Sequence, residues 1–191
     1  DLDAASLDDV KNWFRRGYGP NNAVLVLAGD IDLATAKEKV AKFFGDIPAG
    51  PDFVQPKVNV SPMKADSRLV LTDKVPQVSW NRMWNVAQVG SADEDALDLF
   101  SQVLGGSSSS RLDKRLVHQD KLVDSISTNY YGQQLSGRFS ISATIKQGVD
   151  PKKVEAIIEE ELQKLLKDGP TQAELDQAKV DRKAGIIRQN E

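Results

Sequence analysis

The sequence predicts an α+β fold in which a mostly antiparallel sheet is covered by helices on one face. Two observations predict it. Helical and strand-like patterns do not alternate regularly along the chain, as they would in a parallel sheet with crossover helices. Residues 137–145 alternate strictly between apolar and polar side chains, which is typical of a strand with one buried and one open face. The 191 residues suffice for one domain with its own hydrophobic core.

The first part of the chain is predicted to form a helix, a strand and a second helix. Ser6 and Asp9 form a variant capping box at the start of a helix over residues 7–16. The continuous apolar run 23–28 lies between turn signals, which predicts a strand buried on both faces. Residues 36–44 then carry an apolar stripe at helical spacing, and a glycine ends this second helix.

The middle of the chain is predicted to be an extended connection followed by strands. Residues 46–66 carry four prolines and little periodicity, so we expect them to join two parts of one domain. Residues 68–72 and 77–86 predict strands, and the second is interrupted by Arg82 between two tryptophans. Two arrangements are open for Arg82, which can stack on these rings or point to solvent at a sheet edge. A helix over 92–104 follows.

The next segment is predicted to contain a tight turn, a helix and a β-hairpin. The glycine- and serine-rich residues 105–110 predict a tight connection between two helices. Ser110 is the expected N-cap of the second of these helices, which continues through His118. The runs 123–131 and 137–145, with a short polar loop between them, predict an antiparallel hairpin.

The most regular helical pattern covers residues 151–168. We expect its acidic run 159–161 to lie mostly on the solvated face of the helix. Thr171 and Glu174 form a capping box for a last helix, which continues to the end of the chain. The apolar stripe of the helix over 151–168 is expected to be buried and consists of Val154, Ile157, Ile158, Leu162, Leu165 and Leu166.

Composition excludes several classes of function. A net charge of -3 and an aromatic content of 6% leave no basic, base-stacking surface for nucleic acid. Without cysteine the chain has no disulfide, thiolate metal site or cysteine nucleophile, and this is compatible with cytosol or periplasm. A catalytic zinc site usually takes two or three histidines, and the sequence has only His118, so no metal ligands are predicted. No apolar run approaches the roughly 20 residues that cross a bilayer.

Two short motifs invite a catalytic or nucleotide-binding interpretation, and both fit poorly. The Gly-Gly-Ser run at residues 105–110 lacks the lysine and the second glycine that a phosphate-binding Walker loop needs. A serine nucleophile at Ser110 would lie eight residues from His118, roughly 12 Å along a helix and too far for a hydrogen bond. We therefore interpret the run as a helix connection and His118 as a surface residue.

Three segments resemble the pitrilysin/insulinase family of zinc peptidases. Residues 18–30 match the family pattern Y-x-P-x-N-A-x-L-x-x-x-G-D. The helix over 36–45, followed by Ile47 and Pro48, matches its F-G-x-I-P continuation, and residues 103–112 resemble its L-L-G-G-x-x-S-S-R-L segment. The match covers nearly the whole chain in the correct order. It implies a fold like that of mitochondrial-processing-peptidase subdomains, specifically the second subdomain of one half of an enzyme whose two halves enclose a peptide-digesting chamber.

The chemistry of that family depends on an inverted zinc motif, H-x-x-E-H, whose glutamate acts as general base on the zinc-bound water. A sequence with one histidine cannot contain this motif. The resemblance therefore implies no catalytic residue, no metal ligand and no cofactor in this chain, with zinc held by a subdomain upstream of residue 1. The chain opens without methionine and closes inside a helical pattern, so we expect residues 1–191 to be a single α/β subdomain of a longer, multi-subdomain protein.

A second family feature follows the serine-rich segment. Active partner halves carry L-R-x-K-x-x-L-x-Y, whose arginine and tyrosine hold the substrate backbone and stabilise the developing oxyanion. Here Val117 stands at the arginine position and Asp124 at the tyrosine position. Neither can supply those donors, so the resemblance identifies this chain as the copy that lacks the dyad, in the same half as the zinc motif.

The resulting hypothesis is a non-catalytic subdomain of an insulinase-type zinc metalloendopeptidase. It would complete the chamber wall, support the upstream zinc-bearing subdomain, and face a second half of the same protein or a partner subunit. The alternative is a scaffold that keeps the fold without peptidase activity, and a third idea is a free-standing binding module. An H-x-x-E-H motif upstream would distinguish a peptidase from a scaffold, and the family resemblance favours a periplasmic or exported bacterial protein.

Overall fold

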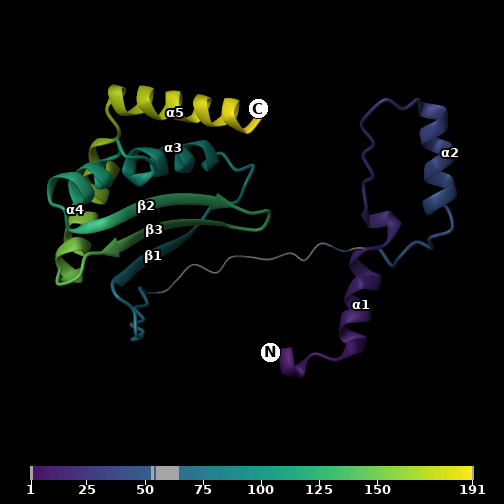
Figure 1. Ribbon diagram of the computed structural model, residues 1–191, viewed down its shortest axis with the longest axis horizontal. Coiled ribbons are helices and arrows are strands. Elements are labelled where there is room, and N and C mark those ends of the chain that lie inside the picture. The colour runs from purple at the N-terminus through teal and green to yellow at the C-terminus, as the bar shows by residue number, and fades with distance from the viewer. Residues whose placement is uncertain (1, 53, 55–64, 191) are drawn as a thin grey trace. The chain divides into compact units, whose positions relative to one another are not determined.

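The computed structural model describes residues 2–52, 54 and 65–190 (Figure 1). The chain divides into two compact units, Asp1–Lys57 and Val58–Glu191. We call them the N-terminal unit and the C-terminal unit and describe each by itself. Most of the predicted proline-rich connection over 46–66 lies outside the described residues. No helix in the described part of the chain is long and apolar enough to span a membrane.

The N-terminal unit contains two helices of the predicted kind. α1 (Leu7–Gly17) begins at the predicted capping box, in which Asp9 N–H donates to Ser6 Oγ over 3.2 Å and Ser6 N–H donates to Asp9 Oδ2 over 2.9 Å. α2 (Leu33–Phe44) begins three residues earlier than its apolar stripe, because Asp32 accepts the Thr35 N–H over 2.9 Å and thereby caps it. Two short 3₁₀ turns, Leu2–Ala4 and Pro20–Asn22, complete the unit.

Two predicted strands are not formed. Residues 23–28 and 68–72 lie outside any strand, and the prediction that 23–28 are buried on both faces is wrong, since Val24 and Val26 are 92% and 79% exposed. A strand is stabilised by hydrogen bonds to a neighbouring strand. Neither segment has such a neighbour among the described residues. An apolar run indicates a tendency to form a strand, but it does not provide the pairing.

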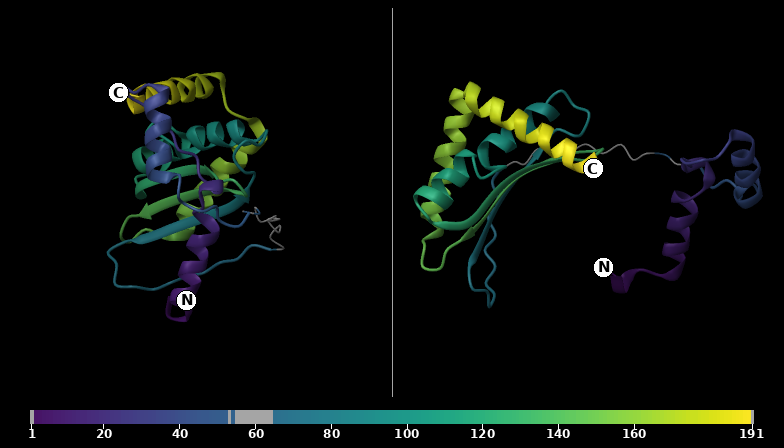
Figure 2. Two further views of the ribbon diagram at one scale, coloured as in Figure 1. Left: turned by 90° about the vertical axis from the view of Figure 1, so that its right-hand side faces the viewer. Right: turned by 45° about the horizontal axis from the view of Figure 1, so that its top comes forward.

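The C-terminal unit contains an antiparallel sheet of three strands, in the order β1-β3-β2. Both strand pairs are antiparallel, and β2 and β3 form the predicted hairpin. Three α-helices gather on one side of the sheet (Figures 1 and 2), so the predicted α+β fold is confirmed. The elements in chain order are β1 (Val78–Val86), α3 (Glu94–Gly105), a π-helical segment (Asp113–Gln119), β2 (Val123–Gly132), β3 (Gly137–Ile145), α4 (Pro151–Asp168) and α5 (Gln172–Asn190).

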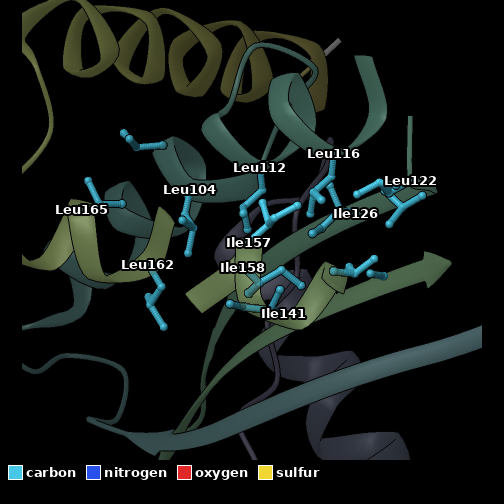
Figure 3. Packing of buried hydrophobic residues seen from close by; sticks show 14 of the residues in the cluster. Leu104, Leu112, Leu116, Leu122, Ile126, Ile141, Ile157, Ile158, Leu162 and Leu165 are labelled. Carbon is cyan, nitrogen blue, oxygen red and sulfur yellow. The ribbon is translucent and has the colours of Figure 1, made fainter. Parts of the chain in front are cut away.

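The core lies between the helices and one face of this sheet (Figure 3). The strict alternation of β3 puts Phe139, Ile141 and Ile145 on the buried face, at 5% exposure or less. The helices contribute the opposing layer. The fully buried members of that layer are Leu104, Leu112, Leu116, Val154 and Ile158.

α4 bears out the predicted stripe with one exception. Leu162 and Leu165 are buried, at 8% and 2% exposure, and Val154 is fully covered. Leu166 is 61% exposed, so its predicted burial is wrong. At 100° per residue Leu166 lies about 120° around the helix from Val154, beyond the edge of the buried stripe.

We expect Leu162→Ala and Leu165→Ala each to lower the free energy of unfolding by about 2–5 kcal/mol, because each leaves a cavity in a packed layer. Leu166→Ala is the matched control on the same helix and should change stability by less than about 0.5 kcal/mol. Urea denaturation of the three variants measures the difference. Equal midpoints for Leu162→Ala and Leu166→Ala would contradict the observed orientation of α4.

Candidate functional site

The residues singled out by the sequence lie in the segment between α3 and the start of β2. Gly105, the last residue of α3, permits α3 to pack closely against β2. A Cβ on Gly105 would lie 2.8 Å from Thr128 Cγ2. Thr128 is buried and its hydroxyl donates to the carbonyl of Ser101 in α3. Gly105 therefore serves the packing of α3 against the sheet. This agrees with the interpretation of the Gly-Gly-Ser run as a connection between helices.

Ser110 lies at the predicted N-cap position, since the helix begins at Arg111 and Lys114 N–H donates to Ser110 O over 3.0 Å, but its side chain does not cap the helix. Its hydroxyl donates to the carbonyl of Ser107 over 2.6 Å instead of accepting a hydrogen bond from the helix that follows. That helix is π-helical over Asp113–Gln119, and beyond its end Asp120 N–H donates to Arg115 O over 2.8 Å. The wider turn brings residues five apart together.

His118 illustrates this five-residue spacing. Its Nε2 lies 3.0 Å from Asp113 Oδ1, and the imidazole is 61% exposed. The prediction that His118 is a surface residue is confirmed. The contact joins two residues of one helical turn, and Ser110 is not among its partners.

The arginine of the same motif joins the segment to the α4–α5 connection. Arg111 Nε donates to Glu174 Oε1 over 2.7 Å, its Nη2 donates to Glu174 Oε2 over 2.8 Å, and Nη2 also donates to Gly169 O over 3.1 Å. Thr171 completes the predicted capping box, since its N–H donates to Glu174 Oε2 over 2.8 Å. The guanidinium, together with the Thr171 donors, overcomes the effect of burial and lowers the pKa of Glu174 to about 2. This part-buried pair holds three elements together.

The two positions of the family dyad have different surroundings. Val117 lies in the π-helical segment and packs, partly buried, against the hydrophobic core. Asp124 is exposed at the start of β2, at an irregularity in the pairing with β3. Its carboxylate accepts a hydrogen bond from Gln77 Nε2 and lies 3.9 Å from Lys146 Nζ. Val117 thus contributes to the core, and Asp124 is engaged within the chain.

Arg82 resolves the alternatives left open by the sequence. Its guanidinium carbon lies 4.8 Å from the centre of the Trp84 ring, and Nη1 donates to Glu159 Oε2 over 2.6 Å. Gln163 and Arg82 both donate to Glu159 and lower its pKa. The acidic run of α4 is therefore less solvated than predicted, because Glu161 is also mostly covered and pairs with Lys164.

The asparagines of the first family segment make structural contacts that sequence reasoning did not predict. Asn21 binds the backbone of Gly50 in both directions, donating from Nδ2 over 3.0 Å and accepting at Oδ1 over 2.9 Å. Asn22 Nδ2 donates to Gly17 O at the end of α1 over 2.8 Å. Their position directly after Gly19 and Pro20 was the available signal, because asparagine side chains commonly bind turn backbones.

The zinc implied by the family resemblance does not fit the residues present. No group of three or more His, Asp or Glu side chains in the described ranges is arranged to hold a metal ion. The one imidazole faces a single carboxylate. The described part of this chain therefore contains no group of side chains that could hold a zinc ion.

Comparisons with known proteins agree with the resemblance. The family model described as the peptidase M16 inactive domain matches residues 4–180. The zinc protease PqqE of Helicobacter pylori is 28% identical over 98% of this chain and 43% of its own length. A crystal structure described as a protease from Helicobacter pylori matches with a TM-score of 0.82 and 27% identity, over 98% of this chain and 46% of that one. The chain thus spans less than half the length of these relatives.

Two further relatives differ in their described activity. A Helicobacter pylori protein named non-peptidase homolog YmxG is 24% identical over 91% of this chain and 40% of its own length. The periplasmic protease PqqL from Escherichia coli shares the fold, with a TM-score of 0.59 and 18% identity, over 97% of this chain and 21% of PqqL. The chain is therefore similar to proteins described as proteases and to one described as a non-peptidase.

The Arg111–Glu174 pair makes stability depend on acidic pH. The carboxylate is favoured in the folded state, so its contribution is fully present above the unfolded pKa near 4.5 and is lost as the pH falls towards 2. We expect Glu174→Gln to lower the free energy of unfolding by about 1–3 kcal/mol at pH 7 and to lose the part of the acid dependence between these values. Urea denaturation at pH 7, 4.5 and 3 measures both effects.

Glu160→Gln is the control for this prediction, because Glu160 is solvent-exposed and pairs with Lys164 in its own helix. Its acid dependence should resemble that of the unaltered chain. An unchanged pH profile in Glu174→Gln would show that the pair with Arg111 contributes nothing to folding.

Proposed function

We propose that this chain, which belongs to the peptidase M16 family as an inactive domain, forms a non-catalytic wall of the peptide-digesting chamber in a longer zinc metalloendopeptidase. The observation that carries the proposal is the combination of a family match over almost the whole chain with the absence of the family's catalytic groups from the sequence. Val117 and Asp124 stand where an active half would have its arginine and tyrosine. An inactive domain of this kind contributes shape and support, and another part of the parent contributes the chemistry.

The parent supplies the remaining components. Zinc and its H-x-x-E-H ligands lie in the polypeptide upstream of residue 1, and residues 1–191 act as one subdomain packed against it. A second half, in the same protein or in a partner subunit, closes the chamber around a peptide substrate. The resemblance to zinc proteases of about twice this length supports this arrangement. The periplasmic location described for PqqL supports an exported, periplasmic parent.

A second candidate function is a scaffold in which the fold is kept without any peptidase activity. The specific observation in its favour is the similarity to a protein named as a non-peptidase homolog. The full-length parent decides between them. Purified with zinc, it should hydrolyse an internally quenched peptide, and residues 1–191 alone should not. A folded parent that binds no zinc and cleaves no peptide would establish the scaffold, and cleavage by this chain alone would contradict both proposals.

We expect Val117→Ala and Asp124→Asn to leave peptide turnover by the parent nearly unchanged. Removal of a hydrogen-bond donor to the oxyanion typically lowers turnover by about 100- to 1000-fold. Val117 has no side-chain donor, and the carboxylate of Asp124 would repel a developing negative charge. Turnover at saturating peptide and a thermal melt of each variant test this expectation. A loss of the oxyanion-donor size with unchanged melting would mean that this half touches the reacting peptide bond.

A further inference from the structure

The helix-free face of the sheet in the C-terminal unit has an unusual composition. Strand register arranges its side chains in four rows of three, each row crossing β1, β3 and β2. None of these twelve residues is buried. The rows, from the start of β1 to its end, are Ser79–Thr144–Ser125, Asn81–Ser142–Ser127, Met83–Ser140–Asn129 and Asn85–Arg138–Tyr131.

Arg138 is the one charged residue in these rows. The chain as a whole is 28% charged, and a solvated protein surface typically carries about 25–35% charged side chains of both signs. Seven of the twelve side chains carry a hydroxyl, and three more are asparagines. Hydroxyl and amide groups both donate and accept, as the N–H and C=O groups of a peptide backbone do. These side chains can therefore form hydrogen bonds with the backbone of a peptide that lies across them.

The same face carries the position at which the family dyad would have its tyrosine. Asp124 is exposed at the start of β2, next to the first row. The resemblance implies that this position points to the substrate in active halves. Tyr131 lies seven residues further along β2, roughly 23 Å away at the rise of an extended strand. The four rows thus lead from the dyad position to Arg138.

Arg138 is placed to take an anionic group at the last of these rows. Its guanidinium carbon lies 6.0 Å from the centre of the Tyr131 ring, and Asn85 is its register partner on β1. No carboxylate lies within 4.0 Å of Arg138 among the residues that the structure describes. Of the other arginines of this unit, Arg68, Arg82, Arg111, Arg115 and Arg182 lie within that distance of a carboxylate. Arg188, in the last turn of α5, does not among the described residues.

We propose that Arg138, with Tyr131 and Asn85, is a subsite for the C-terminal carboxylate of an extended peptide that lies along the helix-free face. The inference deepens the proposed function and rests on it for the nature of the ligand, a peptide. A guanidinium binds a carboxylate through two parallel hydrogen bonds, which no hydroxyl on this face can provide. We assign this carboxylate to the C-terminus of the peptide, because Arg138 lies in the last row, next to the hairpin turn. A peptide that lies over the other three rows ends there.

The test measures binding of defined peptides to the 191-residue chain by isothermal titration calorimetry, in low salt and without zinc. The probes are the peptide Ala-Ser-Leu-Ala-Ser-Ala-Leu with a free C-terminus, the same peptide as its C-terminal amide, and an amide in which the last residue is Glu. The free acid should bind at least about tenfold more tightly than either amide, because only it has a carboxylate at the chain end. Arg138→Gln should weaken the free acid about tenfold and leave the amides unchanged.

Lys146→Gln is the matched control, since Lys146 follows the other end of β3 and pairs with Asp124. It should bind all three peptides as the unaltered chain does, and thermal melts should show that both variants fold. Equal binding of free acid and amide, no effect of Arg138→Gln, or no binding of any peptide would overturn the proposal. Equally tight binding of the Glu-ending amide would overturn the assignment to the chain terminus. Because the readout needs no hydrolysis, its outcome is independent of whether the parent cleaves peptides.

Discussion

The two-sided character of β3 is the constraint on which the rest of the C-terminal unit depends. Its odd-numbered residues from Gly137 to Ile145 are buried without exception, and its even-numbered ones are not. As the central strand it fixes the register of both neighbours, so one face of all three strands faces the helices. A shift of one residue would reverse both faces at once. The core and the polar surface are therefore specified by the same alternation.

The second constraint is the attachment of the helices to each other. The pair between Arg111 and Glu174 connects the segment after α3 to the start of α5. Arg111 also donates to Gly169 O, which attaches the end of α4 to the same group. Because both charges are partly withdrawn from water, a pair with two hydrogen bonds is favoured over one that is merely close in space. α5 has one buried residue, Ala178, so this polar contact is a main determinant of its position.

Sequence reasoning predicted the elements that depend on local patterns and failed where pairing or helix geometry decides. The capping boxes at Ser6 and Thr171, the hairpin and the stripe of α4 follow from spacing alone. The strands at 23–28 and 68–72 require a neighbour that a sequence pattern cannot supply. The π-helical turn at residues 113–119 leaves no signature in hydrophobic spacing, so the contact of His118 with Asp113 could not be foreseen. The resemblance places the dyad positions at residues 117 and 124, but it could not show that Val117 packs against the core.

The family motifs separate, in this structure, into a retained part and a lost part. The retained residues make contacts that hold the fold: Asn22 binds the end of α1, Gly105 admits Thr128 and Arg111 binds Glu174. Positions 117 and 124, at which the resemblance places the family's donors for the reacting peptide, hold a valine and an aspartate here. If the chain contributed to catalysis, the donors would be the residues with the least freedom to change, because a transition state needs groups of fixed chemistry in fixed places. A wall or scaffold needs only the packing and the ion pairs, and these are the residues that this chain keeps.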